Sequence, residues 1–249
     1  MTIPTSCLRA LRTSWTRDGR AFRLRVEPGQ MDDFASLEPF HYRPSRPATF
    51  SRILRIVDPG SGRGASPTLA GVMVVSFPAL WATWRRSAAP GLFDSVESAR
   101  NPVLVNRLVR TISRVIIDPR YRGLGAASQL VRAYLSSPCT PVTEAVTSMG
   151  RYHPLFESAG MTRFDPPTPP RHQRLEAALA GMGIRASDLI DLSRASLLIR
   201  DSRVAEALAV WHRRGRGSAR RWRSRPMIEV AVLAGTALAA RPVGYIHVQ

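Results

Sequence analysis

The chain has 249 residues, 44% of them hydrophobic, which is enough for one large domain or for one domain with an extension. Its net charge is +18 at pH 7, and all 36 basic residues are arginines. No apolar run reaches the roughly 20 residues of a membrane span, and the N-terminus lacks the apolar core of a signal peptide. We therefore expect a cytoplasmic protein with no membrane partner.

The charge also indicates what kind of partner to expect. A basic excess of this size favours a polyanion, most simply nucleic acid. Arginine suits such a partner because its planar guanidinium binds phosphate through two hydrogen bonds and stacks on bases. A GC-rich codon bias would also enrich arginine, and the sequence does not separate the two causes. The two cysteines, Cys7 and Cys139, have no metal-ligand spacing and are interpreted as reduced thiols.

Residues 20–166 predict a mixed α/β domain, and residues 1–19 before it are interpreted as a basic leader. β-Branched or alternating segments bounded by turn residues favour strands, at 21–26, 50–57, 69–77, 113–117, 141–148 and 161–164. Amphipathic or capped segments favour helices, at 30–40, 102–110, 124–136 and 154–159. Residues 81–100 are predicted to form a loop. The expected order of elements is therefore β-α-β-β-(α)-β-α-β-α-β.

The proline-rich segment 166–170 is a stiff break, after which the pattern becomes helical. Helical segments are predicted at 173–182, 187–192, 195–213 and 228–240, so residues 171–249 are expected to form a helical, arginine-rich C-terminal extension. The run 212–225 holds seven arginines and no acidic residue. A solvated loop is one interpretation of this run, and a nucleic-acid contact is the other. The contact residues would be Arg213, Arg214, Arg216, Arg220, Arg221, Trp222 and Arg223.

The most informative segment covers residues 113–135. A strand that includes Ile116 and Ile117 leads to the sequence R-x-x-G-x-G, which begins at Arg120, and then to the helix at 124–136. Glycines let the backbone turn sharply and approach a ligand closely, and a helix N-terminus presents free N–H groups to an anion. The segment therefore predicts a pyrophosphate cradle, with an ordinary tight turn as the alternative.

This segment resembles the acyl-CoA-binding motif of the GNAT N-acetyltransferase superfamily, and the element order of residues 20–166 matches that fold. The resemblance implies a mixed central sheet that is splayed at the cofactor site and has helices on both sides. It also implies a cofactor that is an acyl-CoA, acetyl-CoA above all. The residues implicated in cofactor binding are Ile116, Ile117, Arg120, Arg122, Gly123, Gly125 and Ala126. GNAT enzymes often use a tyrosine in a later F-Y-x-K-x-G-F helix to protonate the departing thiolate. Phe156 stands at that position here and has no proton to give, which disfavours routine acetyl transfer.

Several polar residues near the expected cleft are candidates for the chemistry, namely His41, Tyr42, Glu144, Tyr152 and His153. Three interpretations stay open. One is a general acid/base pair with an arginine that binds substrate, and another is a packed aromatic cluster. The third is a non-haem iron site, since two histidines and a carboxylate, here His41, His153 and Glu144, suit that metal. Arg114, at the start of the strand, is predicted to bind phosphate or an acid group.

Three motif islands narrow the resemblance: H-Y-R at residue 41, S-R-V-x-x-D-P-x-Y-R-G-x-G from residue 113, and M-x-R-Y-x-P-x-F-x-x-A-G-M from residue 149. Together they are similar to the GNAT-like group that includes the phage Mom DNA-modification protein and its relatives fused to ATP-binding cassette proteins. That resemblance implies modification of adenine in DNA, an iron ion and, for a phage gene, a location in the host cytoplasm. It assigns catalytic roles to His41, Tyr42, Arg114, Glu144 and Tyr152.

The favoured hypothesis is therefore an enzyme that places a small acyl-type group on a nucleic-acid base amine, with adenine N6 in DNA as the expected acceptor. That amine is paired in duplex DNA, so the base must be flipped or the duplex opened. Stacking on the base is expected from Tyr42, Tyr152, Trp81 or Trp84. One alternative is a conventional acetyl-CoA-dependent N-acetyltransferase of a protein, tRNA or small amine. Another is a non-catalytic protein with a GNAT fold that binds DNA or RNA.

Overall fold

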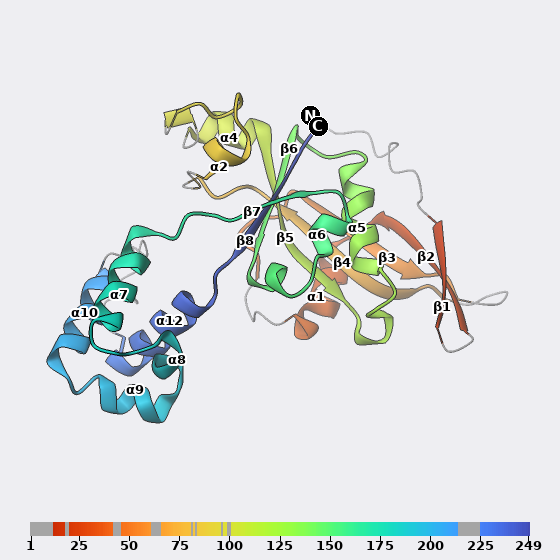
Figure 1. The fold of residues 1–249 in the computed structure, drawn as a ribbon. Coiled ribbons are helices and arrows are strands. Elements are labelled where there is room, and N and C mark those ends of the chain that lie inside the picture. Colours follow the sequence, from red (N-terminus) through yellow and green to blue (C-terminus); the bar gives the residue numbers. More distant parts are fainter. Residues whose placement is uncertain are drawn as a thin grey trace. The chain divides into compact units, whose positions relative to one another are not determined.

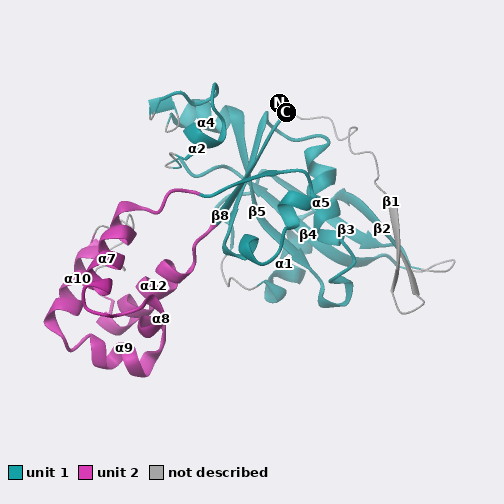
Figure 2. Ribbon diagram, viewed as in Figure 1, with its two compact units in different colours: residues 1–165, 243–249 teal, residues 166–242 magenta. Residues whose placement is uncertain are grey.

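The computed structural model describes residues 12–17, 20–41, 46–60, 66–80, 82, 84–95, 97–98, 101–213 and 225–249. The chain divides into two compact units (Figure 2). Unit 1 comprises residues 1–165 and 243–249, and unit 2 comprises residues 166–242. Unit 2 is therefore inserted into unit 1, because the chain returns to unit 1 for its last seven residues.

The strands of unit 1 form one mixed sheet with the neighbour order β1-β2-β3-β4-β5-β6-β8-β7 (Figure 1). All neighbouring pairs are antiparallel except β5 and β6, which are parallel. The prediction of a mixed α/β fold with helices flanking a mixed sheet is confirmed. The strands are β1 (Arg12–Arg17), β2 (Arg20–Pro28), β3 (Arg52–Asp58), β4 (Thr68–Ser76), β5 (Val109–Ile117), β6 (Val142–Thr147), β7 (Thr162–Phe164) and β8 (Val243–Val248).

Helices cover both faces of this sheet. Side chains alternate along β4, so that Met73 and Val75 belong to the hydrophobic cluster of α5, whereas Val72 and Val74 belong to the cluster of α1. The helices of unit 1 are α1 (Met31–Leu37), α2 (Arg85–Ala88), α4 (Pro102–Leu108), α5 (Ala126–Leu135) and α6 (Leu155–Ser158), with short 3₁₀ turns η2 (Glu38–Phe40), η3 (Pro119–Tyr121) and η4 (Ser148–Arg151). The segment 81–100, predicted as a loop, thus contains α2.

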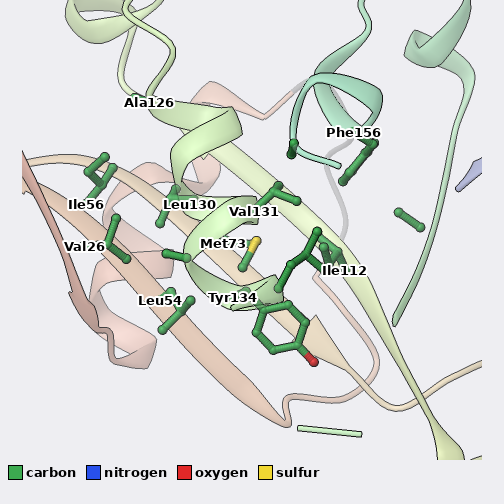
Figure 3. Packing of buried hydrophobic residues seen from close by; sticks show 14 of the residues in the cluster. Val26, Leu54, Ile56, Met73, Ile112, Ala126, Leu130, Val131, Tyr134 and Phe156 are labelled. Atoms are coloured by element: carbon green, nitrogen blue, oxygen red, sulfur yellow. The ribbon is translucent and has the colours of Figure 1, made fainter. Parts of the chain in front are cut away.

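Helix α5 is the best anchored of these helices. Leu130, Val131 and Tyr134 project from it into the main core, where Met73 of β4 and Leu54 of β3 meet them (Figure 3). Each of these side chains is fully buried, and burial of a Leu or Val contributes about 1.5–3 kcal/mol. The core therefore fixes the start of α5, and with it the glycine-rich turn that precedes the helix.

Unit 2 is a bundle of short helices with a core of its own. Its centre is formed by Leu179, Leu189, Leu208 and Ala234, all of which are 0–1% exposed. The helices are α7 (Pro170–Ala180), α8 (Ala186–Ile190), α9 (Leu192–Leu198), α10 (Ser202–Arg213) and α12 (Met227–Ala239). None of the helices among the described residues combines the length and apolar character needed to cross a bilayer.

The structure differs from the predicted extension over residues 171–249 at its end. Residues 243–248 form β8, which pairs with β6 on one side and with β7 on the other, so that the blue strand of Figure 1 lies among green ones. The reason is that Val243 and Tyr245 bury their side chains in the main core of unit 1. Both partners of β8 lie about 80–100 residues earlier in the chain, beyond the reach of a local pattern.

Candidate active site

A cavity opens in unit 1 where two strands of the sheet separate. Strands β5 and β6 pair in parallel only between Val109–Thr111 and Val142–Glu144, although β5 continues to Ile117 and β6 to Thr147. The cavity has a volume of about 820 Å³. It is lined by Pro39, Phe40, His41, Thr111, Ile112, Ser113, Arg114, Val115, Ile116, Ile117, Arg122, Val146, Thr147, Met149, Gly150, His153, Leu155 and Phe156.

The divergence has a chemical consequence for the backbone. Beyond Thr111 and Glu144 the facing edges of β5 and β6 no longer pair with each other, and an unpaired strand edge presents N–H and C=O groups in a row. An extended ligand that carries amide groups of its own would pair with such edges in the way that a further strand does. The side chains around them are largely apolar, so the cavity suits a chain with alternating amide and aliphatic parts.

The glycine-rich turn follows β5 after the short 3₁₀ turn η3. Gly123 and Gly125 adopt positive φ angles of +81° and +71°, and a Cβ atom on Gly123 would have no neighbour within 4 Å. Leu124 between them is buried and anchors the turn. Helix α5 begins at Ala126, and Gly125 supplies no side-chain cap. The first N–H groups of α5 therefore have no capping side chain, which is the arrangement that binds anions at helix N-termini.

The two arginines of this turn have different positions. Arg120 donates from Nε and Nη2 to the Asp118 carboxylate, over 3.0 and 2.9 Å. These side-chain hydrogen bonds, and then the one from the Arg120 backbone N–H, lower the pKa of Asp118. Arg122 instead lines the cavity, and it donates to the carbonyl oxygens of Ile117 and Phe40. Arg122 is thus the arginine of the motif that contributes to the cavity wall, and Arg120 shapes the turn.

Two of the predicted catalytic residues, His41 and Arg114, line this one cavity, and so does His153, which was predicted as an iron ligand. The predicted cofactor residues Ile116 and Ile117 line it as well.

Tyr152 does not line it, because its position at the end of η4 leaves 83% of the side chain exposed. Tyr42 lies outside the described residues, as do Trp81, Arg214, Arg216, Arg220, Arg221, Trp222 and Arg223. Of the predicted nucleic-acid contact, Arg213 is described, and it ends α10 with an exposed side chain.

Glu144 lies outside the cavity wall. Its side chain is 4% exposed and forms two hydrogen bonds with the fully buried Arg85, Nε to Oε2 over 2.9 Å and Nη2 to Oε1 over 2.8 Å. Thr111 Oγ1 donates a third, over 2.7 Å. Alternation along β6 places Glu144 on the face where Arg85 of α2 can reach it. Ala145 faces the α5 cluster, whereas Val142, on the same face as Glu144, packs with residues of the α2–α4 region.

The predicted iron ligands are consequently not brought together. His41 and His153 line the cavity, but Glu144 is not among its lining residues, and its carboxylate is paired with the buried Arg85. Among the described residues, no group of three His, Cys, Asp or Glu side chains is placed to hold a metal ion. We therefore derive no step through a metal.

Two residues that the sequence did not single out support the cavity wall. Arg85 is one, through its pair with Glu144. The other is Tyr245 of β8, whose ring centroid lies 5.0 Å from that of Phe156 and whose Oη reaches Glu157 Oε2 at 3.2 Å and the Gly150 oxygen at 3.3 Å. Burial, and then the Glu157 carboxylate, raises the pKa of Tyr245, so its phenol stays protonated. The alternation in V-G-Y-I-H-V is the signal that could have revealed β8.

Comparison with protein-family models and with curated proteins finds no match for this chain.

Proposed function

We propose that this chain is an acyl-CoA-dependent N-acyltransferase of the GNAT kind whose acceptor is a nucleic-acid base amine, with adenine N6 in DNA as the expected acceptor. The observation that carries the proposal is the cavity between the diverging strands β5 and β6. Its unpaired backbone edges fit the amides of pantetheine, and the uncapped start of α5, which follows β5 after the η3 and glycine-rich turns, fits a pyrophosphate.

The residues suited to hold the cofactor are those of the turn. The backbone of Gly123 to Ala126 would bind the pyrophosphate, because positive φ angles and open space around Gly123 let a ligand approach the N–H groups. Arg122 adds a guanidinium at the adjoining wall. When bound, acyl-CoA would supply an activated thioester acyl group. Ile116 and Ile117 provide apolar surface beside it.

The lining also limits which groups can move a proton. No Asp or Glu is among the described lining residues, and the groups suited to general base catalysis are His41 and His153. We propose that one of them takes the proton that the acceptor amine loses as its nitrogen is acylated. Phe156 and the buried Tyr245 behind it cannot protonate a leaving group in the cavity directly, so a lining histidine or solvent has to supply that proton.

The mouth of the cavity and the overall charge support a nucleic-acid acceptor. Phe40 and Met149 line the cavity with 45% and 48% of their surfaces exposed, and such apolar faces suit an unstacked base. Arg114 and Arg122 make the lining cationic, and the whole chain carries a net charge of +18. A nucleic acid fits both features, because its phosphates match the positive charge and a base amine is carried on a flat ring that can stack on the apolar surfaces.

A calorimetric titration of acetyl-CoA into the full chain tests the cofactor site. The variants are Gly123→Ala and, as a matched control, Gly183→Ala in unit 2. Both glycines have positive φ angles, +81° and +72°, and open space where Cβ would stand, so both substitutions impose a similar backbone strain of about 1–2 kcal/mol. We expect acetyl-CoA affinity to fall at least tenfold in Gly123→Ala and to be unchanged in Gly183→Ala.

Nucleoside mass spectrometry tests the acceptor. DNA from cells that express the wild type should contain a mass-shifted deoxyadenosine, which should be lost with Gly123→Ala and retained with Gly183→Ala. The variants His41→Gln and His153→Gln should show which histidine is the general base, because the modified nucleoside should be lost only in the variant that lacks it. Unmodified DNA together with acetylation of a peptide or small amine would contradict the nucleic-acid acceptor. Absence of any binding of acetyl-CoA or related acyl-CoA compounds would contradict the whole proposal.

A further inference from the structure

Unit 2 carries a groove of its own between two helices. It has a volume of about 310 Å³ and is lined by Arg171, Arg174, Leu175, Ala178, Arg203, Glu206, Ala207, Val210 and Trp211. The first four residues belong to α7 and the others to α10. The floor is apolar, and arginines stand around it, so the groove combines apolar surface with a cationic rim.

Two of the three arginines have no carboxylate partner in the part of the chain that the structure describes. Arg203 is paired with Asp201, over 2.8 Å. Arg171 instead lies with its guanidinium carbon 5.1 Å from the centre of the Trp211 ring, and neither it nor Arg174 forms an ion pair with a described residue. Burial without an anionic partner lowers the pKa of Arg171. An anionic group in the groove would supply the missing charge.

Trp211 of the groove wall and the neighbouring His172 each have a buried polar atom without a hydrogen-bond partner among the described residues. Trp211 is 6% exposed, its ring centroid lies 5.9 Å from that of His172, and both Trp211 Nε1 and His172 Nε2 are buried without a hydrogen-bond partner among the described residues. A buried donor without a partner is costly and uncommon in a wall that has only a packing role. Because Arg171 stacks on Trp211, a ligand that draws Arg171 outward would give these atoms access to acceptors.

The opposing charges are few. Glu206 lines the groove as its one carboxylate among the described lining residues, while Glu176 of α7 pairs with Arg241 over 3.0 Å. In the sequence, Trp211 stands two residues before Arg213, which opens the run with seven arginines and no acidic residue. The charge of the groove therefore continues along the chain, which favours a long anion over a small one.

We propose that the α7–α10 groove binds the sugar-phosphate backbone of a single nucleic-acid strand. Arg171 and Arg174 each contact a phosphate, and the apolar floor receives sugar or base. This inference rests on the proposed nucleic-acid acceptor, and it names a second contact for that strand, in unit 2. The groove lies wholly in unit 2 and so makes no use of the residues that line the acyl-transfer cavity.

Fluorescence anisotropy with the full chain and a 5′-fluorescein-labelled single-stranded 12-nucleotide DNA tests the groove. Each phosphate contact contributes about 0.7 to the slope of log affinity against log salt concentration, which is about a fivefold change in affinity at 0.1 M salt. We expect Arg171→Gln with Arg174→Gln to reduce the slope by about 1.4. The matched control is Arg200→Gln, which removes an exposed arginine that does not line the groove. Glu206→Gln should bind more tightly, because it removes the opposing charge.

The possible results separate this proposal from the proposed function. A reduced slope in the double variant with an unchanged Arg200→Gln supports the groove, whether or not acyl transfer is detected. Equal slopes for the wild type and the double variant, with the fold intact by circular dichroism, would overturn it even where DNA is acylated. Inorganic phosphate or AMP could also remove the difference in slope between the wild type and the double variant while the 12-nucleotide strand stays bound to the protein. That result would overturn the assignment of the groove to a nucleic-acid strand.

Discussion

Replacing Glu144 tests whether this carboxylate is a structural partner of Arg85 or a catalytic group. In Glu144→Gln the neutral amide can no longer balance the charge of Arg85, which is 0% exposed and whose other oxygen partner, the carbonyl of Ala79, is also uncharged. Breaking a buried ion pair in this way costs about 3–5 kcal/mol, because an uncompensated charge stays in the interior. For a unit of this size we expect a fall in Tm of about 6–20 °C, at about 2–4 °C per kcal/mol.

The matched control is the double variant Arg85→Met with Glu144→Leu. Replacement of both charges by apolar groups of similar volume is often neutral or stabilising, so its unfolding free energy should lie within about 2 kcal/mol of the wild type. Thr111 Oγ1 then loses the carboxylate as its acceptor, but because Thr111 lines the cavity, a water molecule can accept that hydrogen bond instead. Differential scanning calorimetry of the full chain measures both variants and can resolve the transitions of the two units.

The two explanations give opposite results. A structural Glu144 predicts a destabilised single variant and a double variant that recovers both stability and acyl transfer. If Glu144→Gln melted within about 1 °C of the wild type while transfer was abolished, the ion pair would not be holding the fold, and the reasoning from burial and distance would be refuted. The carboxylate would then have to reach the cavity in some other conformation.

Two further predictions concern the cavity wall, at Gly150, and the turn after β5, at Asp118. Gly150→Ala should destabilise unit 1, because its Cβ would stand 2.5 Å from Tyr245 Oη, and adding Tyr245→Phe should restore part of the loss in a urea titration; no recovery would mean that the contact is not the cause. Asp118→Asn should lower the free energy of unfolding at neutral pH, and this gap between the variant and the wild type should close in acid. The sign follows from the lowered pKa of Asp118, since the charged form stabilises the fold above its ordinary pKa and is lost as pH falls through the lowered one. Urea midpoints from pH 7 to pH 2 measure the gap, and a constant gap would contradict the role of Arg120.

The parts of the fold that follow local patterns were predictable from the sequence. The strand before the glycines and the helix after them are set by residues within a few positions of one another, and the structure has them as β5 (Val109–Ile117) and α5 (Ala126–Leu135). Their boundaries differ from the predicted 113–117 and 124–136 mainly at the start of the strand. Pairing with β4 extends β5 to Thr111, and that contact is not visible in a local pattern.

The parts of the site that depend on distant pairing were not predictable in the same way. Glu144 was expected to meet the histidines because the presumed fold places all of them near its cleft. Its partner is instead decided by the face of β6 on which it lies, which it shares with Val142 and where it pairs with Arg85 of α2. Tyr152 was expected in the cleft, yet the η4 turn directs it to solvent. Tyr245 comes from the end of the chain. A motif identifies residue types and spacing, and only the packing decides which of them share a surface.

The position of β8 leads to a prediction that separates an insertion from an extension. Truncation after Asp165 removes the whole predicted extension but also β8, which pairs with β6 over six residues and with β7 over three. Two strands of the sheet then lose their shared neighbour, and we expect unit 1 to be insoluble or unfolded by circular dichroism. Joining Asp165 to residue 243 through two to four linker residues should keep the fold. Phe164 pairs with Gly244, so a short hairpin loop can connect the end of β7 to the start of β8. A folded protein from the simple truncation would show that β8 is dispensable and that the last residues belong with unit 2 after all. A folded joined chain that binds acetyl-CoA but has lost strand binding would place the cofactor site in unit 1 and the nucleic-acid contact in unit 2.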